Sequence, residues 1–288
     1  GNQMANLYYY GIYLNRCQNI QAVANKITGS GTTYYGYYIA GSMGIVFREN
    51  ELYGNMNFYG YFLSNVSGSA SMPNQLINNV VSCNFSATTP RAFYFSTSAT
   101  DGLDYLEMHH NSFEARVNST STTANGLLYF LGGSATAPTM SRLIMQNNIF
   151  RLVRAGGTFS ATGLYYFAGN WLIDSTVSNY NLLHFEGQGT SPMVRVSATN
   201  YTLSAWQTTF AEDLNSLNAD PLFNGVNNLT PFGLSPARNA GTPSFVTNDI
   251  AGNIRDVNPD MGAYEIQLGA ADVYVETILN PPAIVQPS

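Results

Sequence analysis

Charge is scarce in this chain, and so are lysine, cysteine and long apolar runs. Charged side chains make up 10% of the 288 residues, against about 25% in typical soluble domains. This disfavours a helical bundle, whose wet faces need charged side chains. Lys26 is the only lysine, the formal net charge is −6, and no basic patch is present, so nucleic acid is not expected as a partner. No apolar run reaches the roughly 18 residues of a membrane-spanning helix, so we expect no membrane insertion.

The residues that replace charge are Asn, Ser, Thr, Gly and Tyr, a composition typical of β-structure with many turns. Two cysteines, Cys17 and Cys83, are too few for a disulfide framework, and the sequence leaves open whether they pair. No secretory signal peptide precedes the first strand-like segment, residues 7–14. We expect this segment to follow a longer N-terminal part.

Two short motifs alternate along most of the chain. The first begins Tyr-Gly and continues with aromatic and aliphatic residues; it occurs at 10–14, 35–39 and 59–63, with looser copies at 91–95, 126–130 and 163–167. The second is an asparagine followed, two positions later, by an apolar residue: Asn25, Asn50, Asn79, Asn111, Asn148 and Asn181. Successive asparagines lie 25 to 37 residues apart. Each unit therefore has room for two or three short strands.

Such a unit is typical of one rung of a solenoid, because a single rung cannot bury its apolar face and stacking does so. We predict an all-β right-handed parallel β-helix, a single-stranded solenoid of about seven rungs over residues 1–205. The asparagines are predicted to turn a corner in the left-handed conformation and to bond the same residue one rung away. A β-sandwich and a βα solenoid remain alternatives, disfavoured by the scarcity of Asn-Gly turns and of amphipathic helical stretches.

From Trp206 onward the repeat stops and a different set of motifs begins. They are Asp213-Leu-Asn-Ser, Asp220-Pro-Leu-Phe223, Leu234-Ser-Pro-Ala, Asp249-Ile-Ala-Gly-x-x-Arg255 and Pro259-Asp-Met-Gly-Ala-Tyr-Glu265. Over residues 206–265 the chain resembles the closing segment of secreted bacterial right-handed β-helix proteins, the pectate-lyase-like superfamily common in Bacteroidetes. The resemblance implies a secreted, extracellular protein attached to the cell surface, with further domains on both sides.

We expect residues 206–268 to cap the last rung, which otherwise exposes unpaired backbone groups. The aromatic residues available to cover it are Trp206, Phe223, Phe232 and Tyr264, and Asp249 is expected to pair with Arg255. Four acids are candidates for a calcium site, although turn and cap roles are commoner for Asp beside Pro and Gly: Asp213, Asp220, Asp249 and Asp260. No other cofactor is indicated. Residues 269–288 are predicted to form an extra strand and a Pro-rich linker.

Alternation along the aromatic strands predicts one outward column of side chains about 4.8 Å apart: Tyr13, Tyr38, Phe62, Tyr94, Tyr129 and Tyr166. Three interpretations stay open. The column is a binding platform for sugar rings or a partner, a ladder that stabilises itself by stacking, or, in an inverted register, part of the core. Small residues beside it are expected to leave a shallow trough: Gly11, Gly36, Gly60 and Ala92.

One polar cluster has a composition suited to catalysis. Glu107 and His109 share a strand face, with Arg48 expected two rungs earlier and Gln146 one rung later; lyases of the resembling superfamily use a base together with a cation or Arg. The leading hypothesis is nevertheless a non-catalytic secreted or cell-surface module, adhesin-like or binding polysaccharide through the outer aromatic column. A polysaccharide lyase or glycoside hydrolase and a passive structural stalk are the alternatives.

Overall fold

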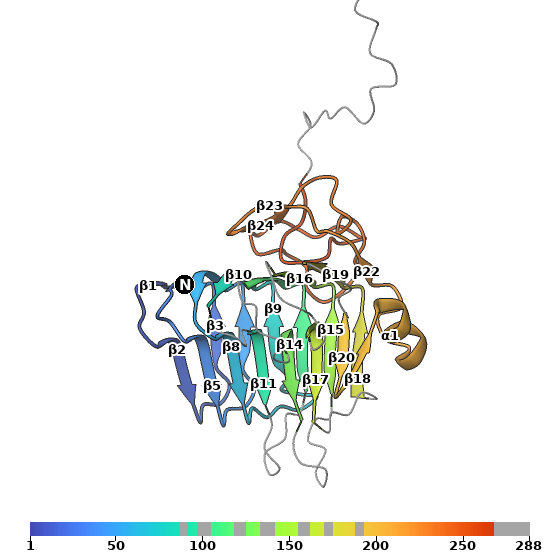
Figure 1. Cartoon of the computed structure of the whole chain (residues 1–288). Helices are drawn as coiled ribbons and strands as arrows, with labels where there is room; N and C mark the ends of the chain where they lie inside the picture. The colour runs from blue at the N-terminus through green and yellow to red at the C-terminus, as the bar shows by residue number, and fades with distance from the viewer. Residues whose placement is uncertain are drawn as a thin grey trace, which may run out of the picture.

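Three parallel sheets run along the molecule, and the chain visits them in turn (Figure 1). The computed structural model describes residues 1–86, 91–96, 105–117, 125–132, 142–154, 162–169, 175–187 and 193–267. In the sheets, parallel neighbouring strands are three apart in chain order, so that each turn of the chain lays one strand on each sheet. The predicted all-β right-handed parallel β-helix is confirmed.

Sheet 1 contains β1 (Gln3–Ala5), β4 (Lys26–Ser30), β7 (Glu51–Met56), β10 (Val80–Phe85), β13 (Ser112–Val117), β16 (Ile149–Arg154), β19 (Leu182–Glu186) and β22 (Leu217–Asn218). Sheet 2 contains β2 (Tyr10–Asn15), β5 (Tyr35–Ala40), β8 (Tyr59–Ser64), β11 (Arg91–Ser96), β14 (Asn125–Leu131), β17 (Thr162–Ala168) and β20 (Val194–Val196), with β21 (Thr199–Tyr201) antiparallel at its end. Sheet 3 contains β3 (Gln21–Val23), β6 (Val46–Arg48), β9 (Asn74–Ile77), β12 (Leu106–His109), β15 (Leu143–Gln146) and β18 (Thr176–Asn179).

A short helix and a hairpin follow the sheets. Helix α1 spans Leu203–Phe210 and is capped at its N-terminus by Thr202, whose hydroxyl accepts a hydrogen bond from the N–H of Ala205. The hairpin consists of β23 (Phe223–Gly225) and β24 (Asn228–Pro231). In the described part of the chain, no helix is both long and apolar enough to cross a membrane.

The interior is filled by columns of like side chains from successive rungs. Tyr37 and Tyr61, for example, are both fully buried and stack with ring centroids 4.5 Å apart and an interplanar angle of 2°. The column on sheet 1 is aliphatic and aromatic throughout: Ile27, Leu52, Val81, Phe113, Phe150 and Leu183. Each rung therefore buries its apolar side chains against those of the next rung, which it cannot do alone.

A ladder of asparagines runs along the corner that precedes sheet 1. Each side-chain amide donates to the Oδ1 atom of the next asparagine at 2.9–3.0 Å: Asn25, Asn50, Asn79, Asn111, Asn148 and Asn181. Asn2 extends the ladder at one end and Asp213 at the other, each through a bond of 3.1 Å. From Asn50 to Asn181 these side chains are completely buried.

The left-handed backbone at this corner lies one residue before each asparagine, which corrects the expectation. The φ angles are 53–58° at Ala24, Glu49, Asn78, His110, Asn147 and Tyr180. The ladder asparagine instead uses its own backbone N–H to donate to the same Oδ1 atom as its amide, for example Asn111 to Asn148 at 2.9 Å. Both donors have to point at the next rung, so the preceding residue makes the turn.

The end of the last rung is covered by α1. Trp206 is completely buried, stacks on Phe167 with centroids 5.8 Å apart, and donates from Nε1 to the Asp213 carboxylate at 3.0 Å. Residues 219–267, the C-terminal arm, instead run along the outer side of sheet 1 (Figure 1). The predicted strand and linker at 269–288 lie outside the described residues.

Because the arm lies along the solenoid, three of the expected capping residues lie elsewhere. Phe223 and Tyr264 pack beside Tyr53 and Val80 of sheet 1, and Phe232 is 54% exposed. The expected pairing of Asp249 with Arg255 is also wrong, because Arg255 forms its ion pair with Glu265. Both corrections have one cause: the motif residues hold the arm to the side of the solenoid.

Arg255 forms a buried ion pair with Glu265 at 3.1 Å and donates to Asn78 Oδ1 at 2.9 Å. The Asp249 carboxylate accepts from the backbone N–H groups of Asn253 at 2.8 Å and of Glu265 at 2.9 Å, so it closes turns within the arm. The motif that resembles the bacterial closing segment thus forms a polar network within the arm that is joined to the solenoid through Asn78. Both cysteines, Cys17 and Cys83, are free thiols.

Candidate functional site

The outward aromatic residues of the repeat form one column on sheet 2. Their strands pair in register, so that each is the lateral neighbour of the next: Tyr13, Tyr38, Phe62, Tyr94, Tyr129 and Tyr166. The residues on either side of Tyr38 along the strand, Tyr37 and Ile39, are completely buried, whereas Tyr13 is 51% exposed. The column is on the outside of the solenoid, and the interpretation with an inverted register is wrong.

The rings of this column stack on one another. From Tyr13 to Tyr129, successive centroids are 4.8–5.4 Å apart and interplanar angles are 7–18°. The last pair differs, since Tyr129 and Tyr166 meet edge to face at 78°. Stacking along the column covers both faces of most rings, so ring edges and phenolic hydroxyls are what the column offers to solvent.

Two further columns lie beside the first and escaped the sequence prediction. Tyr10, Tyr35 and Tyr59 stack at 5.3 Å, and a shorter column contains Tyr9, Tyr34 and Phe58 at 4.6 and 5.2 Å. The signal was present, because an aromatic residue precedes the glycine in each early copy of the motif. It was missed because strict alternation breaks there: β5 buries two consecutive residues, Gly36 and Tyr37. We call the three columns together the aromatic face.

The small residues beside the column face the core, which corrects the predicted trough. A Cβ atom on Gly36 would lie 2.6 Å from Leu52 Cδ2 and 2.7 Å from the carbonyl oxygen of Gly60. Ala92, two rungs beyond Gly36, is completely buried. Glycine and alanine are therefore needed so that the rungs approach closely inside the bend.

Arg91 takes the place of the next tyrosine after Tyr59 in the second column. Its guanidinium lies 3.7 Å from the ring centroid of Tyr129 and 4.9 Å from that of Tyr94, and it donates to the hydroxyl of Tyr59 at 3.4 Å. Burial raises the pKa of Tyr94 and Tyr129, although Arg91 lowers it. These phenols stay protonated at neutral pH and remain hydrogen-bond donors, beside a cation held against their rings.

The predicted catalytic residues do share the outer face of sheet 3. Arg48, Ile77, His109 and Gln146 are successive neighbours, and Glu107 lies 3.9 Å from His109 Nε2. His109, however, is 4% exposed and lies beneath Phe245 of the arm, with ring centroids 4.9 Å apart. Burial lowers the pKa of His109 to about 4. The imidazole is a neutral group covered by the arm.

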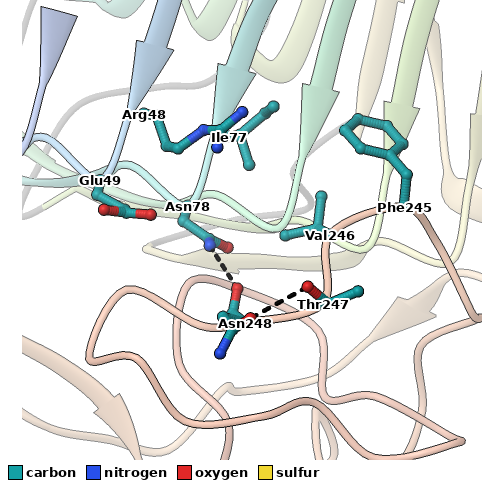
Figure 2. A pocket seen from close by; sticks show the side chains of 8 residues that line it. All are labelled: Arg48, Glu49, Ile77, Asn78, Phe245, Val246, Thr247 and Asn248. Atoms are coloured by element: carbon teal, nitrogen blue, oxygen red, sulfur yellow. Dashed lines mark hydrogen bonds between the residues drawn. The ribbon is translucent and has the colours of Figure 1, made fainter.

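A pocket of about 280 Å³ opens next to this cluster, between the corner after sheet 3 and the arm (Figure 2). Arg48, Glu49 and Ile77 line it from the solenoid, and the arm contributes the segment that begins with Phe245 and ends with Asn248. Sequence reasoning singled out Arg48 but had no means of finding Phe245, because the arm carries no repeat that relates it to the rungs.

The acids considered for calcium accept hydrogen bonds from neighbouring groups of the chain. The Asp213 carboxylate ends the asparagine ladder, the Asp220 carboxylate accepts from the N–H of Leu222 at 3.0 Å, and the two oxygens of Asp260 accept from backbone N–H groups. Within the described ranges, no group of three His, Cys, Asp or Glu side chains is placed to hold a metal ion. Structural roles in turns and at the end of the ladder therefore account for the hydrogen bonds that these carboxylates accept.

Comparison of the chain with models of protein families, with curated proteins and with solved structures finds no significant match.

Proposed function

We propose that this chain is a secreted, cell-surface β-helix module without catalytic activity that binds polysaccharide along the aromatic face. The supporting observation is the set of three adjacent columns, which repeat aromatic side chains over the first three rungs and in one column over six. A surface that repeats along a straight axis suits a ligand that also repeats, such as an extended glycan chain. Tyrosine suits this contact because its ring is apolar and its tip is polar.

In this proposal, the stacking of the rings restricts which parts of each tyrosine a sugar contacts. Since stacking covers most ring faces, a sugar meets ring edges and phenolic hydroxyls, and hydrogen bonds to those hydroxyls carry the specificity. Arg91, fixed over Tyr94 and Tyr129, adds a donor for sugar hydroxyl or carboxylate oxygens. Such a face functions as an adhesin-like surface that needs no enclosed cavity.

The order of the motifs between Trp206 and Glu265 supports the finer part of the proposal, that the chain belongs with the secreted pectate-lyase-like β-helix proteins of Bacteroidetes. The parallel β-helix fold agrees with this assignment. The motif acids and Arg255 make contacts that hold the arm together, which gives their sequence pattern a structural reason.

The contacts around Glu107 and His109 support the part of the proposal that excludes catalysis at this cluster. A substrate reaches His109 only if Phe245 moves, and a carboxylate oxygen of Glu107 already accepts a hydrogen bond from Gln75 at 2.8 Å. A general base has to lie within hydrogen-bond reach of the proton that it removes.

Binding is tested by affinity electrophoresis and glycan arrays with tyrosine variants that keep the rings. Tyr38→Phe and Tyr94→Phe each remove one hydroxyl and retain the stack, so we expect each to weaken binding to any retained glycan by about three- to tenfold, the effect of one lost hydrogen bond. Phe62→Tyr inserts a hydroxyl between these two and should strengthen it.

Tyr180→Phe is the matched control, because Tyr180 lies at the corner beside the arm and away from sheet 2. It should leave binding unchanged. The binding proposal is wrong if no glycan on the arrays binds, or if none of the three variants of the column changes binding. The columns would then be a ladder that only stabilises itself, on a structural stalk. Release of unsaturated or shortened sugars by the wild-type chain would contradict the absence of catalysis.

A further inference from the structure

The pocket between sheet 3 and the arm has one apolar wall and one charged wall. Phe245 is 57% exposed and presents its ring to the pocket, with Ile77 and Val246 beside it (Figure 2). Its contact with His109 is edge to face, at an interplanar angle of 76°, so the two rings do not stack. An exposed aromatic ring in a concave site is a typical contact for the apolar C–H face of a small ring-shaped ligand.

Some of the polar groups around the pocket are already engaged. Asn78 donates to the backbone oxygen of Asn248 at 2.7 Å and accepts from Arg255 at 2.9 Å. The Asn248 side chain accepts from Thr247 at 3.0 Å and donates to Gly252 O at 3.1 Å. These residues build the wall and hold the arm on the corner, as the dashed lines of Figure 2 show for two of the bonds.

Arg48 and Glu49 differ from the rest of the wall. Neither side chain makes a hydrogen bond or an ion pair with the residues that the structure describes, although both backbones bond to neighbouring rungs. They are consecutive, and the left-handed backbone at Glu49, with φ of 57°, turns the chain between β6 and β7 at this point. The pocket thus offers one cation with several N–H donors and one carboxylate with only acceptors.

The two charges cancel, which restricts the ligand that satisfies both. An anion gains from Arg48 and loses at Glu49, and a cation does the reverse. A neutral polyhydroxyl compound suits both, because every hydroxyl both donates and accepts a hydrogen bond. The volume of about 280 Å³ lies just below the range of roughly 300–1,000 Å³ usual for drug-sized ligands, which leaves room for one sugar ring.

We propose that this pocket binds a single neutral sugar unit, with its apolar face on Phe245 and its hydroxyls on Arg48 and Glu49. The site is on a different side of the solenoid from the aromatic face and does not depend on it. It takes a free monosaccharide, a chain end or a side branch, whereas the aromatic face takes an extended chain.

The test is saturation-transfer NMR and calorimetric titration of the whole chain with glucose, galactose, mannose and N-acetylglucosamine, alongside galacturonate and glycine. We expect at least one neutral sugar to bind with a dissociation constant near the millimolar range and more tightly than galacturonate or glycine. Phe245→Ala and Arg48→Gln should each weaken it about tenfold or more, and Glu49→Gln should weaken it less, because the amide keeps one acceptor.

Two exposed residues provide matched controls. Phe232→Ala removes an arm phenylalanine that is 54% exposed and outside the pocket lining, and Arg16→Gln removes an exposed arginine at another corner. Both should bind the sugar as the wild type does, and so should Tyr38→Phe, which separates this site from the aromatic face. The proposal is overturned if no neutral sugar gives a signal at tens of millimolar, if galacturonate or glycine binds more tightly, or if Phe245→Ala and Arg48→Gln bind unchanged.

Discussion

Asn111 is the residue whose removal tests the asparagine ladder most directly. It is completely buried, and its side chain makes four hydrogen bonds. Its amide donates to Leu76 O and Asn148 Oδ1, both at 2.9 Å, and its Oδ1 atom accepts from the backbone N–H and the amide of Asn79 at 2.9 and 3.0 Å. The replacement Asn111→Ala deletes all four bonds at once.

The magnitude follows from the partners left behind. The buried N–H of Asn79 loses its acceptor, which costs about 1–3 kcal/mol, and the three other bonds contribute about 1 kcal/mol each. We therefore expect Asn111→Ala to lower the free energy of unfolding by about 4–6 kcal/mol. Asn111→Asp should cost at least as much, because a buried carboxylate cannot donate to Leu76 or Asn148.

The assay is urea unfolding followed by circular dichroism. The control is Asn55→Ala, since Asn55 also bonds an asparagine one rung away, Asn84 at 3.0 Å, but on the exposed face of sheet 1. A surface change of this kind is expected to stay within about 0.5 kcal/mol. If Asn111→Ala costs no more than Asn55→Ala, the ladder does not hold the corner and the reasoning is wrong.

Three further predictions concern pH, thiols and the arm. The pKa of His109 is about 4 in the folded chain against an ordinary 6.5, so the folded state binds fewer protons than the unfolded state between these pH values. The free energy of unfolding should therefore fall by up to about 3 kcal/mol as the pH drops from 6.5 to 4. The difference between wild type and His109→Gln across a pH series of urea titrations isolates the contribution of His109. Burial raises the pKa of Cys83, so a maleimide should label Cys17 alone in the native protein and both thiols in urea; equal labelling rates would contradict the packing. Arg255→Met leaves the buried carboxylate of Glu265 unpaired, which should lower the free energy of unfolding by about 3–5 kcal/mol. Protease should then cleave the arm before it cleaves the sheets. An arm that stays resistant would show that the ion pair is dispensable.

The solenoid was predictable because its contacts join equivalent positions of successive repeats. A side chain such as Tyr38 touches its counterparts Tyr13 and Phe62, so periodicity along the sequence translates directly into neighbours in space. The same reasoning placed Arg48 and His109 on one face.

Prediction from the sequence failed where the backbone departs from simple alternation of buried and exposed residues. The bend at Gly36 buries two residues in a row, which reversed the expected direction of the small residues and hid the column that contains Tyr35. A left-handed residue before each ladder asparagine was likewise not visible, since that position is variable: it is Ala24 in one rung and His110 in another.

By itself the sequence determined the repeat, and with it the parallel β-helix and the outward aromatic column, because each of these depends on contacts between like positions. Only the tertiary structure decided where the arm lies. Its contacts, such as that of Arg255 with Asn78, 177 residues apart, join segments with no shared period. The pocket lined by Arg48 and Phe245 and the covering of His109 both result from that docking, since the arm supplies one wall and buries the imidazole.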